Sequence, residues 1–227
     1  MPSRNTVYRQ DAEDCYYHVY GRGMLRADIF IDDQDYTVFL NLLKRYLGTK
    51  EDRDNKGRLR KNYHEQLELL AFCLMPNHFH LLFHQTEKGA IAKVMQGITL
   101  CYGKYFNHKY QRFGSLLESR YKSSLILEDN YLMHASRYIH LNPDDYENWK
   151  WSSLPYYTKG WTADWVKPDF IKEVVEANHF SSYKQFVDEY KTNRDQIKEM
   201  ESMYLEEYDE VPRNYYNNPL AEEELGQ

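Results

Sequence analysis

The chain has 227 residues, a net charge of −6, 42% hydrophobic and 16% aromatic residues, and 22 tyrosines. This length suits one hydrophobic core with an appendage, and no apolar run approaches the length of a membrane-spanning helix. The N-terminus begins no signal peptide. Its three cysteines, Cys15, Cys73 and Cys101, form neither a CxxC motif nor a disulfide framework, so we expect a protein of the reducing cytoplasm.

Charge is distributed unevenly along the chain. From residue 161 onward there are 7 Lys and Arg against 16 Asp and Glu, whereas residues 1–160 carry 22 against 19. The first 160 residues are therefore mildly basic, which permits nucleic-acid binding without requiring it.

The predicted elements alternate between strand and helix. Strands are expected at 16–20, 65–75, 78–84 and 120–127, and helices at about 33–48, 90–110 and 130–142. The order β-α-β-β-α-β-α indicates a mixed α+β fold. Residues 49–63 are charged and predict a loop or hairpin tip. A Trp- and Tyr-rich connector follows Pro143, and two further helices are expected at 168–178 and 181–200.

Two histidines separated by one apolar residue follow the Pro76-Asn77 turn. In a strand, His78 and His80 project from the same face while Phe79 enters the core on the other. Two neutral imidazoles placed this way form half of a site for a divalent metal. A single H-x-H motif is more often a polar strand face, so the prediction needs further ligands elsewhere in the chain.

The helix expected at 130–142 supplies two such groups. Tyr138 and Asn142 lie one turn apart on the stripe that also holds His134, so a phenol and an amide can meet the same object. If that object is a metal held by the histidines, Asn142 is a third ligand through its carbonyl oxygen. Most of the 22 tyrosines serve packing or the surface, so only the combination with the histidine pair singles out Tyr138.

A tyrosine beside a divalent cation favours attack on a phosphodiester. The cation polarises the electrophile and offsets the weak nucleophilicity of a phenol with a pKa of about 10. Attack would leave a covalent phosphotyrosyl bond that conserves the energy of the cleaved linkage. No ATP site is required, and the chain contains no Gly-rich phosphate loop with Lys and Ser or Thr.

These motifs together resemble those of the single-tyrosine HUH transposases, specifically the REP-associated tyrosine transposase branch. The match covers roughly residues 14–157 in the family's order. It comprises Tyr17-His18-Val19 with Arg22-Gly23, Ile29-Phe30 with Asp32-Asp33 and Asp35-Tyr36, Phe72 through Leu81, Gly114, Arg120-Tyr121-Lys122-Ser123, Arg137-Tyr138-Ile139 and Leu141-Asn142-Pro143.

The resemblance implies a ferredoxin-like antiparallel sheet, which we expect to carry helices packed on one face, within an HUH transposase domain at 1–160. Beyond this domain, the helical pattern of the sequence predicts a C-terminal helical extension at 161–200, and the acidic composition of 201–227 predicts a flexible tail. The acidic region beyond residue 161 is not a general feature of the family. The resemblance also makes His78, His80 and Asn142 ligands of Mg²⁺ or Mn²⁺ and Tyr138 the nucleophile. The implied substrate is hairpin-flanked single-stranded DNA, cut to a 5′-phosphotyrosine and a free 3′-hydroxyl by a monomer or homodimer.

Basic residues of the first 160 positions are candidates for phosphate contacts, with ordinary solvated charge as the alternative for each. Tyr105, Tyr110 and Phe113 are candidates for stacking on unpaired bases, although Tyr105 is expected to face the helix core. The basic candidates are Arg22, Arg26, Lys104, Lys109, Arg112, Arg120 and Lys122.

Two other functions remain open from the sequence. A non-catalytic DNA- or RNA-binding regulator could retain the fold, and it would bind hairpins without cutting them. A metal hydrolase using the histidines and water would release free products, with no protein bound to the DNA.

Overall fold

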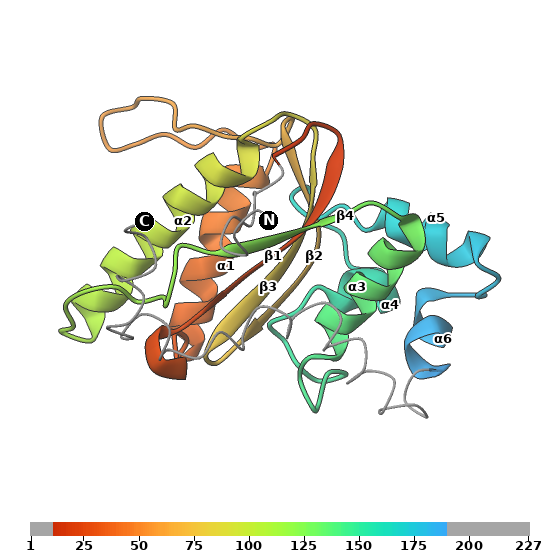
Figure 1. Ribbon diagram of the computed structural model, residues 1–227. Coiled ribbons are helices and arrows are strands. Elements are labelled where there is room, and N and C mark those ends of the chain that lie inside the picture. The colour runs from red at the N-terminus through yellow and green to blue at the C-terminus, as the bar shows by residue number, and fades with distance from the viewer. Residues whose placement is uncertain (1–10, 190–227) are drawn as a thin grey trace, which may run out of the picture. The chain divides into compact units, whose positions relative to one another are not determined.

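The computed structural model describes residues 11–189 (Figure 1). The described residues up to Val187 belong to one compact unit. No helix among the described residues is long and apolar enough to cross a membrane. The elements are β1 Cys15–Arg22, η1 Met24–Arg26, α1 Asp33–Leu47, β2 Leu67–Met75, β3 His78–Gln85, α2 Ala90–Lys109, β4 Lys122–Ile126, α3 Asp129–Leu141, α4 Leu154–Thr158, α5 Asp169–Ala177 and α6 Tyr183–Asp188.

The four strands form one antiparallel sheet in the order β2-β3-β1-β4. Each of the two β-α-β units leaves a gap that a strand of the other unit fills, which is the ferredoxin-like arrangement. The expected α+β class and sheet are thus confirmed. Within the described residues, the short helix α4 was not expected. Helix α6 falls inside the helix predicted at 181–200, whose residues from 190 onward lie outside the described residues. The predicted tail at 201–227 lies outside the described residues.

Both faces of the sheet are covered, because alternate residues of its strands enter two separate cores. On one face, Leu69, Phe79 and Leu81 pack against α1 and α2, which is the side predicted for Phe79. On the other, Leu70 and Leu82 pack against α3 and the C-terminal helices. Figure 1 shows the two helical layers on opposite sides of the sheet. The sequence predicted helices on one face of the sheet, and α1 and α2 agree with this prediction. Helices α3 to α6 cover the other face, on which the prediction placed no helices.

Helix α1 begins where the sequence predicts it, at a capping box. The Asp32 side chain accepts hydrogen bonds from the backbone of Gln34 and Asp35, and the Asp35 carboxylate bonds back to the Asp32 backbone. These bonds satisfy N–H groups that the first helical turn leaves without partners. Lys109 of α2 lies 2.7 Å and 2.8 Å from carboxylate oxygens of Asp32 and Asp35, and so ties the two helices together.

The hairpin between β2 and β3 is anchored to the turn after β1. The Pro76 carbonyl accepts hydrogen bonds from the backbone of Ile29 and Phe30, and the Asn77 carbonyl accepts one from Gly23. A Cβ on Gly23 would lie 2.0 Å from the carbonyl oxygen of Ala27, so only glycine fits at this position. This anchoring fixes the start of β3, where the histidine motif begins.

Candidate functional site

Histidines from two neighbouring strands project from the sheet face that α3 covers. In the β1–β3 register, Tyr20 is opposite His80 and Arg22 is opposite His78. His18 is two residues before Tyr20 and therefore shares this face. Nε2 of His18 lies 2.9 Å from Nδ1 of His80, and both side chains are buried.

His78 contacts an amide on each side of its ring. Nδ1 lies 2.6 Å from Oδ1 of Asn77, and Nε2 lies 3.0 Å from Oδ1 of Asn142. A neutral imidazole has only one N–H, and the shorter contact places it on Nδ1, donating to Asn77. Nε2 then keeps its lone pair and faces the Asn142 carbonyl oxygen.

Tyr138 reaches the same point from α3. Asn142 has helical dihedral angles (φ −58°, ψ −42°), so its side chain continues the stripe that Tyr138 begins one turn earlier. Nδ2 of Asn142 donates a hydrogen bond of 3.4 Å to the Tyr138 hydroxyl. The Tyr138 ring centroid lies 5.5 Å from that of His80 in an edge-on arrangement. The structure thus brings Tyr138, Asn142, His78 and His80 together.

The imidazoles of this cluster are neutral at pH 7. Burial lowers the pKa of His18 to about 4 and that of His78 to about 4. Burial lowers the pKa of His80 well below its usual value, and repulsion from Arg22, and from His78 and His18 when these are protonated, lowers it further. Neutral imidazole is the form that binds metals, so the environment keeps these nitrogens available as ligands.

The atoms present fit a divalent cation. Adjacent ligands about 2.1 Å from an octahedral Mg²⁺ lie about 3.0 Å apart, and Nε2 of His78 and Oδ1 of Asn142 have this separation, 3.0 Å. Two nitrogens and one neutral oxygen leave further positions for water or phosphate oxygens. Residues 11–189 contain no cluster of three or more His, Cys, Asp or Glu side chains placed to hold a metal. Any site here therefore depends on the amide.

His18 was missed as a candidate by the sequence reasoning. The strand Tyr16-Tyr17-His18-Val19-Tyr20 places His18 and Tyr20 on one face, but that alternation alone does not identify the neighbouring strand. The pairing of β1 with β3 is a long-range contact, and only this pairing places His18 beside His80.

The basic candidates occupy different places. Arg22 is opposite His78, and the Lys122 ammonium lies 5.6 Å from the ring centroid of Tyr20, so both are near the histidine cluster. Arg26 is exposed in the turn after β1. Arg112 and Arg120 line a separate groove beside α2, together with Lys104.

Lys109 is not available as a phosphate contact, because Asp32 and Asp35 hold its ammonium. The hydroxyls of Tyr105 and Tyr110 also bond Asp35, which leaves Phe113 as the exposed aromatic candidate. The Lys109 ammonium and both hydroxyls contact Asp35 because its carboxylate is buried, and a buried charge needs such partners.

Fold and site together define an α+β protein with a histidine pair and a helical tyrosine on one sheet face. The family model described as "Transposase IS200 like" matches residues 11–142. This chain belongs to that family and is thereby placed among the transposases.

Several solved structures are similar to the chain, and two of them are classed as transposases. A REP-associated tyrosine transposase bound to a REP hairpin is 16% identical over 70% of this chain and 89% of that one, with a TM-score of 0.48. A Deinococcus radiodurans R1 protein classed as a transposase is 16% identical over 54% of this chain and 87% of that one, with a TM-score of 0.36. No curated protein matches the chain. The assignment therefore depends on the family model.

Proposed function

We propose that the chain cuts and rejoins single-stranded DNA, with Tyr138 as the nucleophile and a 5′-phosphotyrosine as the intermediate. The observation that supports this is the position of the Asn142 amide. Its oxygen faces His78 at 3.0 Å, and its nitrogen donates to the Tyr138 hydroxyl at 3.4 Å. The Asn142 side chain therefore contacts both the Tyr138 hydroxyl and the nitrogen of His78 that would bind the metal.

In the proposed step, the Tyr138 oxygen attacks the phosphorus and the bond from phosphorus to the 3′-oxygen breaks. The phenol gives up its proton and the leaving 3′-oxygen gains one, so the products are a phosphotyrosyl diester and a free 3′-hydroxyl. Asn142 donates to the phenol oxygen, so this hydrogen bond does not use the hydroxyl proton. The reverse attack by a 3′-hydroxyl joins a strand and releases the tyrosine.

His78, His80 and Asn142 are the residues that would hold Mg²⁺ or Mn²⁺, and a cation there would polarise the phosphodiester and stabilise its developing charge. Asn77 orients His78 through the contact to Nδ1. Arg22 and Lys122 add positive charge beside the histidines, where a phosphate of the substrate would lie. A hairpin next to the cleaved strand is part of the same proposal.

The test is the formation of a covalent adduct. Purified protein is incubated with labelled single-stranded DNA containing a hairpin, with Mn²⁺ or Mg²⁺ or with a chelator, and is then denatured and separated by electrophoresis. We expect labelled protein only with metal, and none from Tyr138→Phe. Tyr131→Phe, an exposed tyrosine on the same helix, is the matched control and should react normally.

The outcomes separate the functions that the sequence leaves open. An adduct from Tyr138→Phe at the normal rate would refute the assigned nucleophile. Cleavage with no label on the protein would favour a metal hydrolase. Hairpin binding without cleavage under every metal would favour a non-catalytic regulator.

A further inference from the structure

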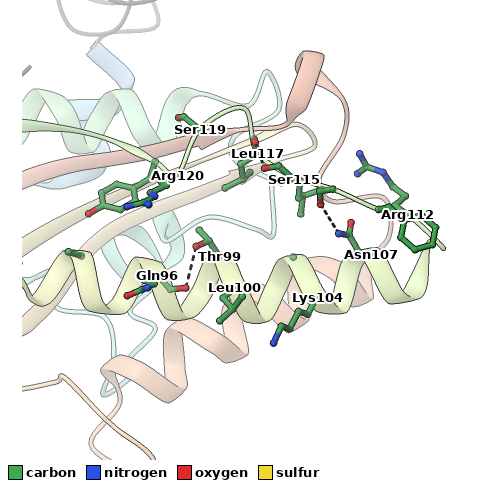
Figure 2. A pocket seen from close by; sticks show the side chains of 16 residues that line it. Gln96, Thr99, Leu100, Lys104, Asn107, Arg112, Ser115, Leu117, Ser119 and Arg120 are labelled. Atoms are coloured by element: carbon green, nitrogen blue, oxygen red, sulfur yellow. Dashed lines mark hydrogen bonds between the residues drawn. The ribbon is translucent and has the colours of Figure 1, made fainter. Parts of the chain in front are cut away.

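A groove lies between the outer side of α2 and residues 112–121, which lead into β4 (Figure 2). Its volume is about 820 Å³. On the side of the groove opposite α2, the backbone of Leu116 and Glu118 forms hydrogen bonds with that of Met24 and Arg22, so this segment extends the edge of the sheet beyond β4. The groove therefore lies along a sheet edge that backbone hydrogen bonds hold. It is separate from the face that carries Tyr138, because α2 and α3 pack on opposite faces.

The charge of the groove has one sign. Its lining includes Lys104, Arg112 and Arg120 and contains no Asp or Glu. None of these three cations forms an ion pair with any residue in the described range 11–189. By contrast, Lys93 on the same helix pairs with Glu87 and Lys109 pairs with two aspartates. A run of cations without carboxylate partners is suited to phosphate groups.

The groove lining also includes an aromatic side chain, Phe113, which follows Arg112 in the chain. Phe113 is 96% exposed. The turn that carries it is held by two bonds of 2.9 Å, from Asn107 Nδ2 to the Gly114 carbonyl and from the Arg112 backbone to the Asn107 carbonyl. The turn also requires the positive φ (88°) of Gly114. An exposed ring beside cations, carried on a turn that hydrogen bonds hold, is a platform on which an unpaired base can stack.

The groove also leads toward the candidate active site. Arg120 lines the groove, Lys122 is two residues further on, and Lys122 lies 5.6 Å from the ring of Tyr20, which is opposite His80. Because β4 is an edge strand, a bound chain can pass around it from one face of the sheet to the other. Arg120 and Lys122 lie along this path, where they could contact phosphates of the bound chain.

We propose that the groove binds a single-stranded segment of the same DNA that Tyr138 cuts. Lys104, Arg112 and Arg120 contact its phosphates, and an unpaired base stacks on Phe113. This proposal rests on the proposed function. Single-stranded DNA is the favoured ligand because bases paired within a duplex do not expose a ring face to Phe113.

Binding can be measured apart from chemistry in the Tyr138→Phe protein, by fluorescence anisotropy with a labelled oligothymidylate of roughly 20 nucleotides, long enough for several phosphate contacts. Replacing all three groove cations by Gln should weaken binding on the order of tenfold or more. The plot of log binding constant against log salt concentration should also become less steep. Its slope should decrease in magnitude by about 0.7 for each phosphate that the variant no longer neutralises. Lys93→Gln, the same change on the same helix outside the groove, should bind like the parent.

The stacking interaction has its own pair of variants. Phe113→Ala should weaken binding roughly tenfold, whereas Phe113→Trp should retain it, because only the second keeps a ring. Circular dichroism of each variant checks that the fold is unchanged. A duplex of the same length should bind less tightly and should be insensitive to Phe113→Ala.

The groove proposal is overturned if the parent binds no oligonucleotide, or if the triple variant and Phe113→Ala bind it like the parent. It is also overturned if Lys93→Gln loses as much affinity as the triple variant. A duplex that binds as tightly as the single strand, and loses as much affinity with Phe113→Ala, would overturn it too. Failure of the proposed function looks different. In that case the protein with Tyr138 intact forms no adduct with any metal, while the groove variants still lose affinity.

Discussion

Nδ1 of His140 lies 2.7 Å from the hydroxyl oxygen of Tyr183, and this contact joins α3, the helix of Tyr138, to α6. Both side chains are buried. On its other side, Nε2 of His140 lies 2.7 Å from Oγ of Ser153. Tyr183 and Ser153 lie beyond residue 142, where the family match ends. Residues outside the shared family region therefore hold the helix that carries the candidate nucleophile.

The donors and acceptors of this network can be assigned. Ser136 Oγ donates to the Met133 carbonyl, so it accepts from the Tyr183 hydroxyl at 2.9 Å. Tyr183 then accepts from Nδ1–H of His140. Oγ of Ser153 lies 2.7 Å from Nε2 of His140 and 3.2 Å from the Phe72 carbonyl oxygen, and we assign its single proton to the shorter contact, so Nε2 accepts. The Ser153 oxygen in turn accepts from the Phe72 backbone N–H. With this assignment each group donates once and His140 is neutral.

Removing the Tyr183 hydroxyl should destabilise the protein. Tyr183→Phe leaves Nδ1–H of His140 without its partner and removes one of the two hydrogen bonds of Ser136 Oγ, and a buried polar group left unpaired costs about 1–3 kcal/mol. The measurement is urea unfolding followed by circular dichroism. Tyr63→Phe is the control, because the Tyr63 hydroxyl makes no hydrogen bond within residues 11–189. Equal stability of Tyr183→Phe and the parent would show that the network contributes nothing measurable.

The same network predicts how stability depends on pH. Burial lowers the pKa of His140 from its usual 6.5 to about 3. Between these two values the unfolded chain binds a proton that the folded protein does not, so the free energy of unfolding decreases as pH falls from 6.5 toward 3. One such proton contributes a slope of about 1.4 kcal/mol per pH unit. Unfolding free energies measured across this range should show the decrease.

His140→Gln isolates this contribution. The variant should be less stable than the parent at pH 7, and the difference should shrink as pH falls, because the variant lacks the group that titrates. Part of the slope should persist, since burial also lowers the pKa of His18 and His78 to about 4. Parallel stability curves for the variant and the parent would contradict a neutral, buried His140.

The sequence was sufficient to predict the elements that depend on local patterns. The Asp32 cap, the periodicity of α1 and α2, and the H-x-H strand all gave element positions within a few residues of those observed. The His140–Tyr183 contact could not be predicted, because its partners are 43 positions apart and belong to helices whose packing no local pattern specifies. The same limit applied to His18, and to Lys109, whose aspartate partners lie on another helix.

Asn77 should tune the proposed metal binding without itself being a ligand. Its Oδ1 lies 2.6 Å from Nδ1 of His78 and fixes the tautomer that leaves Nε2 free. Asn77→Ala should raise the Mn²⁺ concentration needed for half-maximal adduct formation by about 10- to 100-fold, while saturating Mn²⁺ restores most of the rate. Asn148→Ala, in an exposed loop, is the control. A lower rate that no Mn²⁺ concentration restores would place the role of Asn77 elsewhere.

Gly23 should be essential to the hairpin anchor that positions His78. A Cβ there would lie 2.0 Å from the Ala27 carbonyl oxygen and 2.8 Å from Cγ2 of Ile29. The Gly23 backbone also donates a 2.8 Å hydrogen bond to the Asn77 carbonyl, so relief of the clash must disturb that hydrogen bond. Gly23→Ala should therefore lower the free energy of unfolding by about 1–3 kcal/mol and weaken adduct formation.

Gly103→Ala is a control in which the free energy of unfolding should increase rather than decrease. Gly103 lies within α2, and a Cβ there meets no atom within 4 Å, so alanine should stabilise the helix by roughly 0.5–1 kcal/mol. Chemical denaturation of both variants gives the comparison. If Gly23→Ala were as stable as the parent, the turn could relax without cost, and the anchoring of His78 through Asn77 would need another explanation.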